Sequence, residues 1–148
     1  MYPVLIVAAV VILDQLIKYQ VVDKILPIGD LAVIKNFFYI TYVENFGIAF
    51  GMFKNKTWFF VVSISIISLI MIYYIFKFYK KNAAITTCLS FILGGAIGNL
   101  IDRIRLGYVV DYLHFTIFPP VFNLADSAIV LGAIALSIYI VFNKDIAL

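Results

Sequence analysis

The segment TWFFVVSISIISLIMIYYIF, residues 57–76, carries no charged side chain and decides the class of protein. A helix needs roughly 20 mainly apolar residues to cross the hydrocarbon core of a bilayer. Backbone groups inside lipid must be hydrogen-bonded within their own segment, so this stretch predicts a transmembrane helix. Stretches of similar length and character occur at residues 2–22, 84–101 and 124–142. The sequence therefore predicts four spans in a single membrane domain.

Composition supports this class and argues against others. Of the 148 residues, 65% are hydrophobic and 13% are charged, whereas soluble domains carry about 25% charged residues. The net charge is +3 and no basic run occurs, so a nucleic-acid partner is not expected. The single cysteine, Cys88, rules out an internal disulfide and a cysteine-based metal motif. Asp14 and Lys18 interrupt the first apolar stretch, which is therefore expected to be a retained span rather than a signal peptide.

Two of the three connections between the spans are long, at residues 23–56 and 102–123. Within the first, residues 31–44 are rich in β-branched and aromatic side chains and predict one or two strands with a turn near Lys35-Asn36. Residues 45–53 are expected to form a short amphipathic surface helix. The second long connection contains an extended piece at residues 108–115. A small sheet at the membrane surface is therefore expected beside the helices, where the aromatic residues suit the bilayer interface.

Charge distribution gives a prediction for the orientation. Four spans place both termini on one side of the membrane. Lys77, Lys80 and Lys81 crowd the short connection at residues 77–83, which favours a cytoplasmic position for this connection. The raw count of basic residues in the two long connections argues the other way. Because density near the spans outweighs the count, both termini are expected in the cytoplasm and both long connections outside.

Ionisable side chains inside a span are costly and are candidates for function. Asp14 and Lys18 lie four residues apart, on one face of the first helix, in the favourable order for an ion pair. We expect a structural pair that locks this helix into the bundle, with Lys18 reaching outward to the interface. The alternative is a small transporter or channel that uses Asp14 and Lys18 on a proton or ion path.

The third span carries a small-residue surface that ends in polar residues. Gly94, Gly95 and Gly98 allow close helix packing in lipid. The polar residues that follow at the outer end are Asn99, Asp102 and Arg103. Asn99 can hydrogen-bond to another helix, and Asp102 can pair with Arg103 or Arg105. The planar donor fork of Arg103 can instead bind substrate carbonyl groups.

Two further acids flank the fourth span. Asp126 lies in its first turn, after Asn123, a favourable N-cap residue, so a helix-capping role is one interpretation of this acid. Asp111 lies in an apolar run, where burial raises a carboxyl pKa, although a surface-turn position is also possible. If the chain folds back at Pro119-Pro120, the two carboxylates meet at the outer face. Such a pair shares one proton, so one acid can activate water while the other protonates the leaving group. Asp126 is expected to be the base and Asp111 the acid.

Five segments together resemble one family. They are residues 14–18 (DQLIK), 44–51 (ENFGIAFG), 94–103 (GGAIGNLIDR), 108–112 (YVVDY) and 122–127 (FNLADS). In this order, they resemble the lipoprotein signal peptidases, the type II signal peptidases of bacteria. Two positions depart mildly from the family pattern: Tyr112 stands where Phe is frequent, and Phe46 where a small residue is frequent.

The resemblance implies a function and a site. Members of the family are aspartic endopeptidases that remove the signal peptide from diacylglyceryl-modified prolipoproteins, cutting just before the lipidated cysteine. The catalytic pair carries over to Asp111 and Asp126. Positions expected to support the site or bind substrate are Asp14, Lys18, Asn45, Asn99, Asp102, Arg103 and Asn123.

The resemblance also implies a fold and a location. The expected fold is a mainly α membrane protein, with a four-transmembrane-helix bundle, a small extracytoplasmic β-cradle and a short surface helix. The expected location is the bacterial cytoplasmic membrane, with both termini cytoplasmic and the active site at the outer face. The expected partners are the lipidated substrate and membrane lipid. A monomer without metal or organic cofactor is expected.

Overall fold

A computed structural model describes residues 1–47 and 57–143. In this part of the chain the elements, in order, are α1 (Tyr2–Lys24), β1 (Leu31–Ile34), β2 (Phe38–Asn45), α2 (Thr57–Phe78), α3 (Ala83–Leu106), β3 (Val109–Phe115), β4 (Val121–Phe122) and α4 (Leu124–Phe142). All four helices are long and apolar enough to cross a membrane. The chain is therefore a multi-pass membrane protein, mainly helical with a small sheet, as the sequence predicted.

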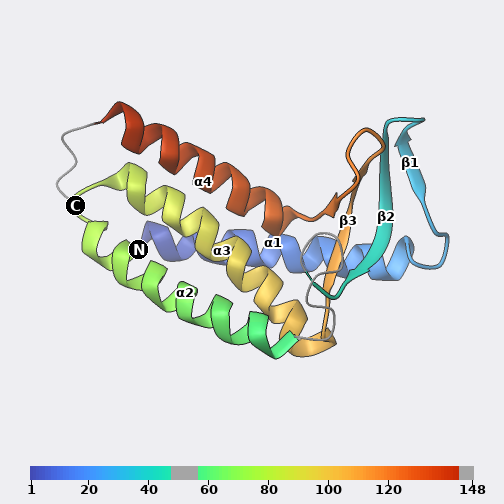
Figure 1. Ribbon diagram of the computed structural model, residues 1–148, viewed down its shortest axis with the longest axis horizontal. Coiled ribbons are helices and arrows are strands. Elements are labelled where there is room, and N and C mark those ends of the chain that lie inside the picture. The colour runs from blue at the N-terminus through green and yellow to red at the C-terminus, as the bar shows by residue number, and fades with distance from the viewer. Residues whose placement is uncertain (48–56, 144–148) are drawn as a thin grey trace.

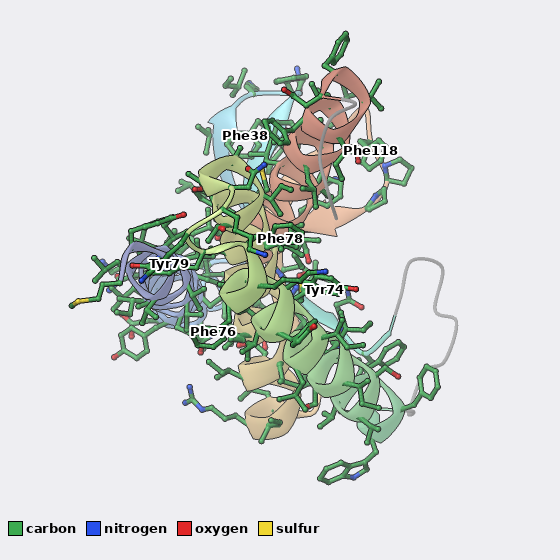
Figure 2. The ribbon with its side chains drawn as sticks, turned by 90° about the vertical axis from the view of Figure 1, so that its left-hand side faces the viewer. Phe38, Tyr74, Phe76, Phe78, Tyr79 and Phe118 are labelled. Carbon is green, nitrogen blue, oxygen red and sulfur yellow. The ribbon has the colours of Figure 1, made fainter. Side chains whose placement is uncertain are left out.

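Helix α3 forms the centre of the bundle. It packs against α4, α1 and α2, whereas α1 and α4 contact each other much less. Figure 2, seen along the bundle, shows these three helices on different sides of α3. Exposed apolar side chains such as Trp58, Phe76 and Phe142 cover the outer surfaces of the helices. This arrangement suits a lipid environment, where apolar side chains need no cover.

Helix α3 continues past the expected end of its span at Ile101 and finishes at Leu106. Its C-cap is Gly107, whose φ of 85° lies in the left-handed region that ends many helices. Asp102 and Arg103 therefore lie on a helix rather than in a loop. Their side chains project from the same rigid element as Asn99, one turn earlier.

The two long connections join into one antiparallel sheet with the order β1-β2-β3-β4. Asn36 takes a φ of 64° in the turn between β1 and β2, so the two predicted strands with a turn at this position are confirmed. β2 pairs with β3 from Phe38 opposite Phe115 to Asn45 opposite Val109. Of the surface helix expected at residues 45–53, Asn45 instead belongs to β2 and residues 46–47 are not helical, and residues 48–53 lie outside the described residues.

The sheet lies at the end of the bundle opposite the first residues of α1 (Figure 1). Val110 and Tyr112 of β3 pack against Val21 and Ile25 at the end of α1, forming a buried cluster. Leu124, the first residue of α4, packs against the same cluster, so β3 lies beside the beginning of α4. We call the half of the bundle next to the sheet the sheet-side half, and the other half the far half.

Candidate active site

The first turn of α4 is closed by a reciprocal cap. The side-chain oxygen of Asn123 accepts a hydrogen bond from the Asp126 backbone N–H at 2.8 Å. The Asp126 carboxylate accepts one from the Asn123 backbone N–H at 3.3 Å. This is a capping box with Asp in place of the usual Glu or Gln. One carboxylate oxygen of Asp126, Oδ2, thus faces the backbone N–H of Asn123.

Two other elements bind the remaining amides of this turn. The first N–H groups of a helix have no partner within the helix and need acceptors from elsewhere. Ala125 N–H donates to Asp14 Oδ1 of α1 at 3.0 Å. Leu124 N–H donates to the Tyr112 hydroxyl of β3 at 3.1 Å. The position of Asp126 is therefore set by α1, β3 and its own capping residue together.

Asp111 lies on β3 and is buried, with 2% of its surface exposed. Asn45 Nδ2 donates to its Oδ2 at 2.8 Å, and Asn123 Nδ2 donates to its Oδ1 at 2.6 Å. Asn123 thus bonds to Asp111 through its side chain and to Asp126 through its backbone. The two acids singled out from the sequence lie on either side of one asparagine.

The surroundings of Asp111 favour its protonated form. Burial is the main cause that raises the pKa of this carboxyl, and the negative charge of Asp126 raises it further. Hydrogen bonds from Asn45 and Asn123 and the positive charge of Lys18 oppose the shift. The resulting pKa is about 7, against a usual 3.8. Asp111 can therefore carry a proton near neutral pH and donate it.

Asn99 connects Asp126 to the ion pairs of the bundle. Its Nδ2 donates to Asp126 Oδ1 at 2.7 Å. Its Oδ1 accepts from Lys18 Nζ at 3.0 Å and from Asn123 Nδ2 at 3.1 Å. Because an ammonium group is only a donor, Lys18 fixes the amide of Asn99 with its oxygen inward. The N–H side of Asn99 must then face Asp126.

Lys18 lies inside the bundle, so the prediction that it reaches outward to the interface is wrong. Its ammonium nitrogen is 2.9 Å from Asp14 Oδ2 and 2.8 Å from Asp102 Oδ2. With Asn99 Oδ1 these oxygens give each of its three protons an acceptor. Full pairing inside the protein removes the reason for the side chain to extend to water.

The ion-pair partner of Asp102 is Lys18 rather than Arg103 or Arg105. Asp102 also accepts hydrogen bonds from the Val110 backbone N–H at 3.2 Å and from Gln15 Nε2 at 2.9 Å. It therefore connects α1 and α3 to the beginning of β3. Gln15 was not among the residues singled out, although a polar side chain beside Asp14 in an apolar stretch could have indicated it.

Arg103 lies at the edge of this cluster. Its Nη1 donates to the backbone carbonyl of Asn99 at 3.3 Å. Its guanidinium carbon lies 5.3 Å from the centre of the Phe60 ring of α2, a cation–π arrangement. It also interacts electrostatically with Asp126 and Asp111. Arg103 thus places a positive charge between α2 and the two acids.

Hydrogen bonds and ion pairs join the nine residues that the sequence proposed as catalytic, supporting or substrate-binding into one connected cluster. Among residues 1–47 and 57–143, no three His, Cys, Asp or Glu side chains are grouped so that they could hold a metal ion. The chemistry that the side chains themselves offer is proton transfer between carboxyl groups and a bound molecule.

Fold and site together define a multi-pass membrane protein with a buried and a half-buried carboxylate, Asp111 and Asp126, at one end of a four-helix bundle. A family model described as "Signal peptidase (SPase) II" matches residues 6–142. The chain belongs to the signal peptidase II family.

Individual relatives agree with this membership. The chain is 52% identical to a lipoprotein signal peptidase of Caldanaerobacter subterraneus subsp. tengcongensis, over 97% of this chain and 98% of the relative. It is 45% identical to that of Halothermothrix orenii, over 92% of both chains. A solved structure described as "Bacterial membrane enzyme structure by the in meso method at 2.3 A resolution" superposes with a TM-score of 0.84 at 34% identity, covering 97% of this chain and 90% of that one.

Membership of this family does not favour the transporter or channel alternative. Asp14 and Lys18 are paired with each other and are nearly inaccessible, at 0% and 3% exposure. They stabilise the cluster from within and do not line an open path.

Proposed function

We propose that this chain is an aspartic endopeptidase that removes the signal peptide from diacylglyceryl-modified prolipoproteins, cutting just before the lipidated cysteine. Asp111 and Asp126 are the catalytic pair. The observation that carries the proposal is that Asn123 bonds to both carboxylates, at 2.6 Å and 3.3 Å. Family membership supports the peptidase reaction, and this geometry supports the choice of Asp111 and Asp126 as the groups that perform it.

The mechanism follows from the different surroundings of the two acids. Asp111 begins protonated because its pKa is about 7. Asp126 lies at a helix N-terminus, which favours a carboxylate, and accepts hydrogen bonds from Asn99 Nδ2 and the Asn123 backbone N–H, so it takes the role of the base. Asp126 removes a proton from a water molecule whose oxygen attacks the scissile carbonyl carbon, giving a tetrahedral oxyanion. When this intermediate collapses, the C–N bond breaks and Asp111 donates its proton to the leaving nitrogen. The proton held by Asp126 then passes to Asp111, which restores the starting state.

The surrounding amides have a positioning role in this mechanism. Asn45, Asn99 and Asn123 all present N–H groups to the carboxylates. These donors hold the oxygens in place before substrate binds, so little reorganisation is needed during the reaction. Lys18 bonds to the Asn99 side chain and is itself held by Asp14 and Asp102. Arg103 offers its remaining donors to carbonyl groups of the substrate peptide.

The orientation proposed here places the sheet and the catalytic pair at the outer face of a bacterial cytoplasmic membrane, with both termini inside. It is supported by the three lysines of residues 77–83 at the far half, opposite the sheet. The signal helix and the acyl chains of the substrate then lie in the bilayer, and the scissile bond lies at its surface. The enzyme acts as a monomer surrounded by membrane lipid.

The test compares Asp111→Asn and Asp126→Asn with the unchanged protein, purified in detergent, on a lipidated precursor. Each variant should lose at least about a hundredfold in turnover, since each removes one partner of the acid–base pair. Asp23→Asn, an exposed acid of the same helix as Asp14, serves as the control and should keep full activity. Near-normal turnover by either catalytic variant would end the dyad proposal. Equal cleavage of an unlipidated precursor would instead remove the diacylglyceryl requirement.

A further inference from the structure

The pairing of β3 with β4 ends just before α4 begins. The last backbone pairs are His114 opposite Val121 and Leu113 opposite Phe122. Beyond them, side-chain bonds replace the ladder, since the chain at residue 123 turns into a helix. One is the bond from Asn123 to Asp111, and the other is the bond from Leu124 N–H to the Tyr112 hydroxyl. Asp111 and Tyr112, two successive residues of β3, thus bind the start of α4.

Tyr112 is well placed to act as a rigid spacer. It is 3% exposed, and its ring packs in the cluster formed with Val21, Ile25 and Val110. Successive residues of a strand project to opposite faces, so Tyr112 points away from the side on which Asp111 meets Asn45 and Asn123. Its hydroxyl still reaches α4, because the phenol ring spans the space between the strand and the Leu124 amide.

Leu124 is the first residue of α4, and Asp126 follows in the same turn. If the Leu124 amide lost its acceptor, the other backbone amides of that turn would keep their bonds to Asp14 and to the cap, and Asp126 would keep its bond from Asn99, but the hydrogen bonds from α4 and its cap to β3 would come from Asn123 alone. The separation between Asp111 on β3 and Asp126 on α4 would then be less firmly set. Catalytic groups displaced by about 1 Å can lose about a hundredfold in rate.

We propose that Tyr112 is a positioning residue for catalysis: its hydroxyl fastens the first turn of α4 to β3 and thereby sets the separation of the Asp111 and Asp126 carboxylates. This inference rests on the proposed function, because it assigns Tyr112 a role through those two acids. Tyr112 does not touch the reacting atoms.

The test replaces Tyr112 by Phe, which keeps the ring and removes only the acceptor. On lipidated precursor, Tyr112→Phe should lower kcat about tenfold, a small displacement on the scale known for catalytic groups, with KM nearly unchanged. The basic limb of the pH–rate profile should move to lower pH, because a more distant Asp126 raises the Asp111 pKa less. The matched control is Tyr39→Phe, whose hydroxyl accepts a backbone N–H from Asn36 at 3.0 Å in the turn between β1 and β2. This control should keep both kcat and the pH profile.

A second variant removes the same hydrogen bond from the donor side. Leu124→Pro deletes the N–H at the first helical position, where proline is well tolerated, and because it also removes a side chain packed against the Tyr112 cluster, its kcat is compared with that of Leu124→Ala. If the bond is what matters, Leu124→Pro should also lower kcat, and the double variant should be no slower than the slower single variant. Multiplied losses in the double variant would show two separate effects and overturn the proposal.

Wild-type kcat and pH profile in Tyr112→Phe would also overturn it, whatever happens to thermal stability. So would an equal loss in Tyr39→Phe. The Asp126→Asn variant separates this inference from the proposed function. Full activity there removes the dyad itself, whereas loss there with a normal Tyr112→Phe removes only the positioning role.

Discussion

The two halves of the helix bundle are held together by different interactions. In the sheet-side half, α1, α3 and α4 meet through charged and amide side chains, with Lys18 bonded to Asp14, Asp102 and Asn99. In the far half, within the residues that the structure describes, the same helices share no ion pair and meet through small residues and one hydrogen bond, from Asn82 Nδ2 to the Tyr139 hydroxyl. Gly94 lies against Val10, and Gly132 lies against the Cys88 carbonyl and Ile92.

The difference suggests that the far half mainly stabilises the bundle, whereas the sheet-side half fixes the positions of the catalytic groups. Apolar side chains gain little by leaving lipid for the protein interior, so the far half depends on close packing between small residues. Close packing brings helices together but has no preferred direction for any single atom. Hydrogen bonds and ion pairs are directional, so the sheet-side half can fix where each carboxylate oxygen of Asp111 and Asp126 lies. The predictions below test this division.

The largest effect is expected from Asp14→Ala. This change removes one of the two carboxylates bonded to Lys18 and the acceptor of the Ala125 amide. Breaking a buried ion pair costs about 3–5 kcal/mol, because the remaining charge stays buried without its partner. Thermal unfolding in detergent should show a much lower Tm, and the fraction that stays folded should turn over more slowly because α4 loses a contact at its first turn.

The matched control for Asp14→Ala is Asp23→Ala, at an exposed position of the same helix. It should leave both Tm and turnover unchanged, since exposed substitutions away from such networks are nearly neutral. Unchanged stability in Asp14→Ala together with lost catalysis would contradict the structural role and place Asp14 in the chemistry itself.

A smaller effect, dependent on pH, is expected from Asp111. The pKa of the Asp111 carboxyl is about 7 in the folded protein, against the usual 3.8 that applies to the unfolded chain. Between these values the folded state binds more protons than the unfolded state, so this group's stabilising contribution is complete below about pH 4 and is lost as pH rises toward 7. At about 1.4 kcal/mol per unit, the loss is at most roughly 4 kcal/mol. Asp111→Asn should abolish this slope, so its Tm should rise relative to the unchanged protein from pH 4 to 7 and stay parallel above.

A constant offset between Asp111→Asn and the unchanged protein carries no information, since the new amide changes the bonds to Asn45 and Asn123 at every pH. The slope alone is the readout. Parallel curves throughout this range would mean that Asp111 is not the group that holds the extra proton.

Much of the fold follows from sequence, and the departures have identifiable causes. Apolar runs predicted all four helices, because length and hydropathy suffice for a span. Hydropathy placed the end of the third span at Ile101, whereas α3 continues to Leu106. The helix continues because Lys18 and the Val110 amide satisfy the Asp102 carboxylate, so the charge does not require water.

In the site, the residues were predictable but several of their partners were not. Each polar group in an apolar stretch is conspicuous in sequence, which is why Asp14, Lys18 and Asn99 stood out. Partner choice depends on how α1, α3 and β3 are placed in register, which only the folded chain reveals. This is why Lys18 was expected to face outward, and why the bond from the Leu124 amide to the Tyr112 hydroxyl was not predicted.

The smallest effect is expected in the far half, from Gly132→Ala. A Cβ at Gly132 would lie 2.9 Å from Ile92 Cγ1 and 3.0 Å from the Cys88 carbonyl oxygen. Alanine favours the helix by about 1 kcal/mol over glycine, but α3 and α4 must move apart, and overpacking costs about 1–3 kcal/mol. The net result should be a modestly lower Tm.

Turnover and its pH profile should stay unchanged in Gly132→Ala, because the bonds from Asp14, Tyr112 and Asn123 still fix the first turn of α4. Ala133→Val, at an exposed position of the same helix, is the control for adding bulk to α4 without touching α3. A loss of kcat in Gly132→Ala as large as that in Asp14→Ala would mean that packing in the far half also sets the geometry of the acids. The directional bonds would then not suffice to hold the catalytic pair, and the two halves would act as one unit.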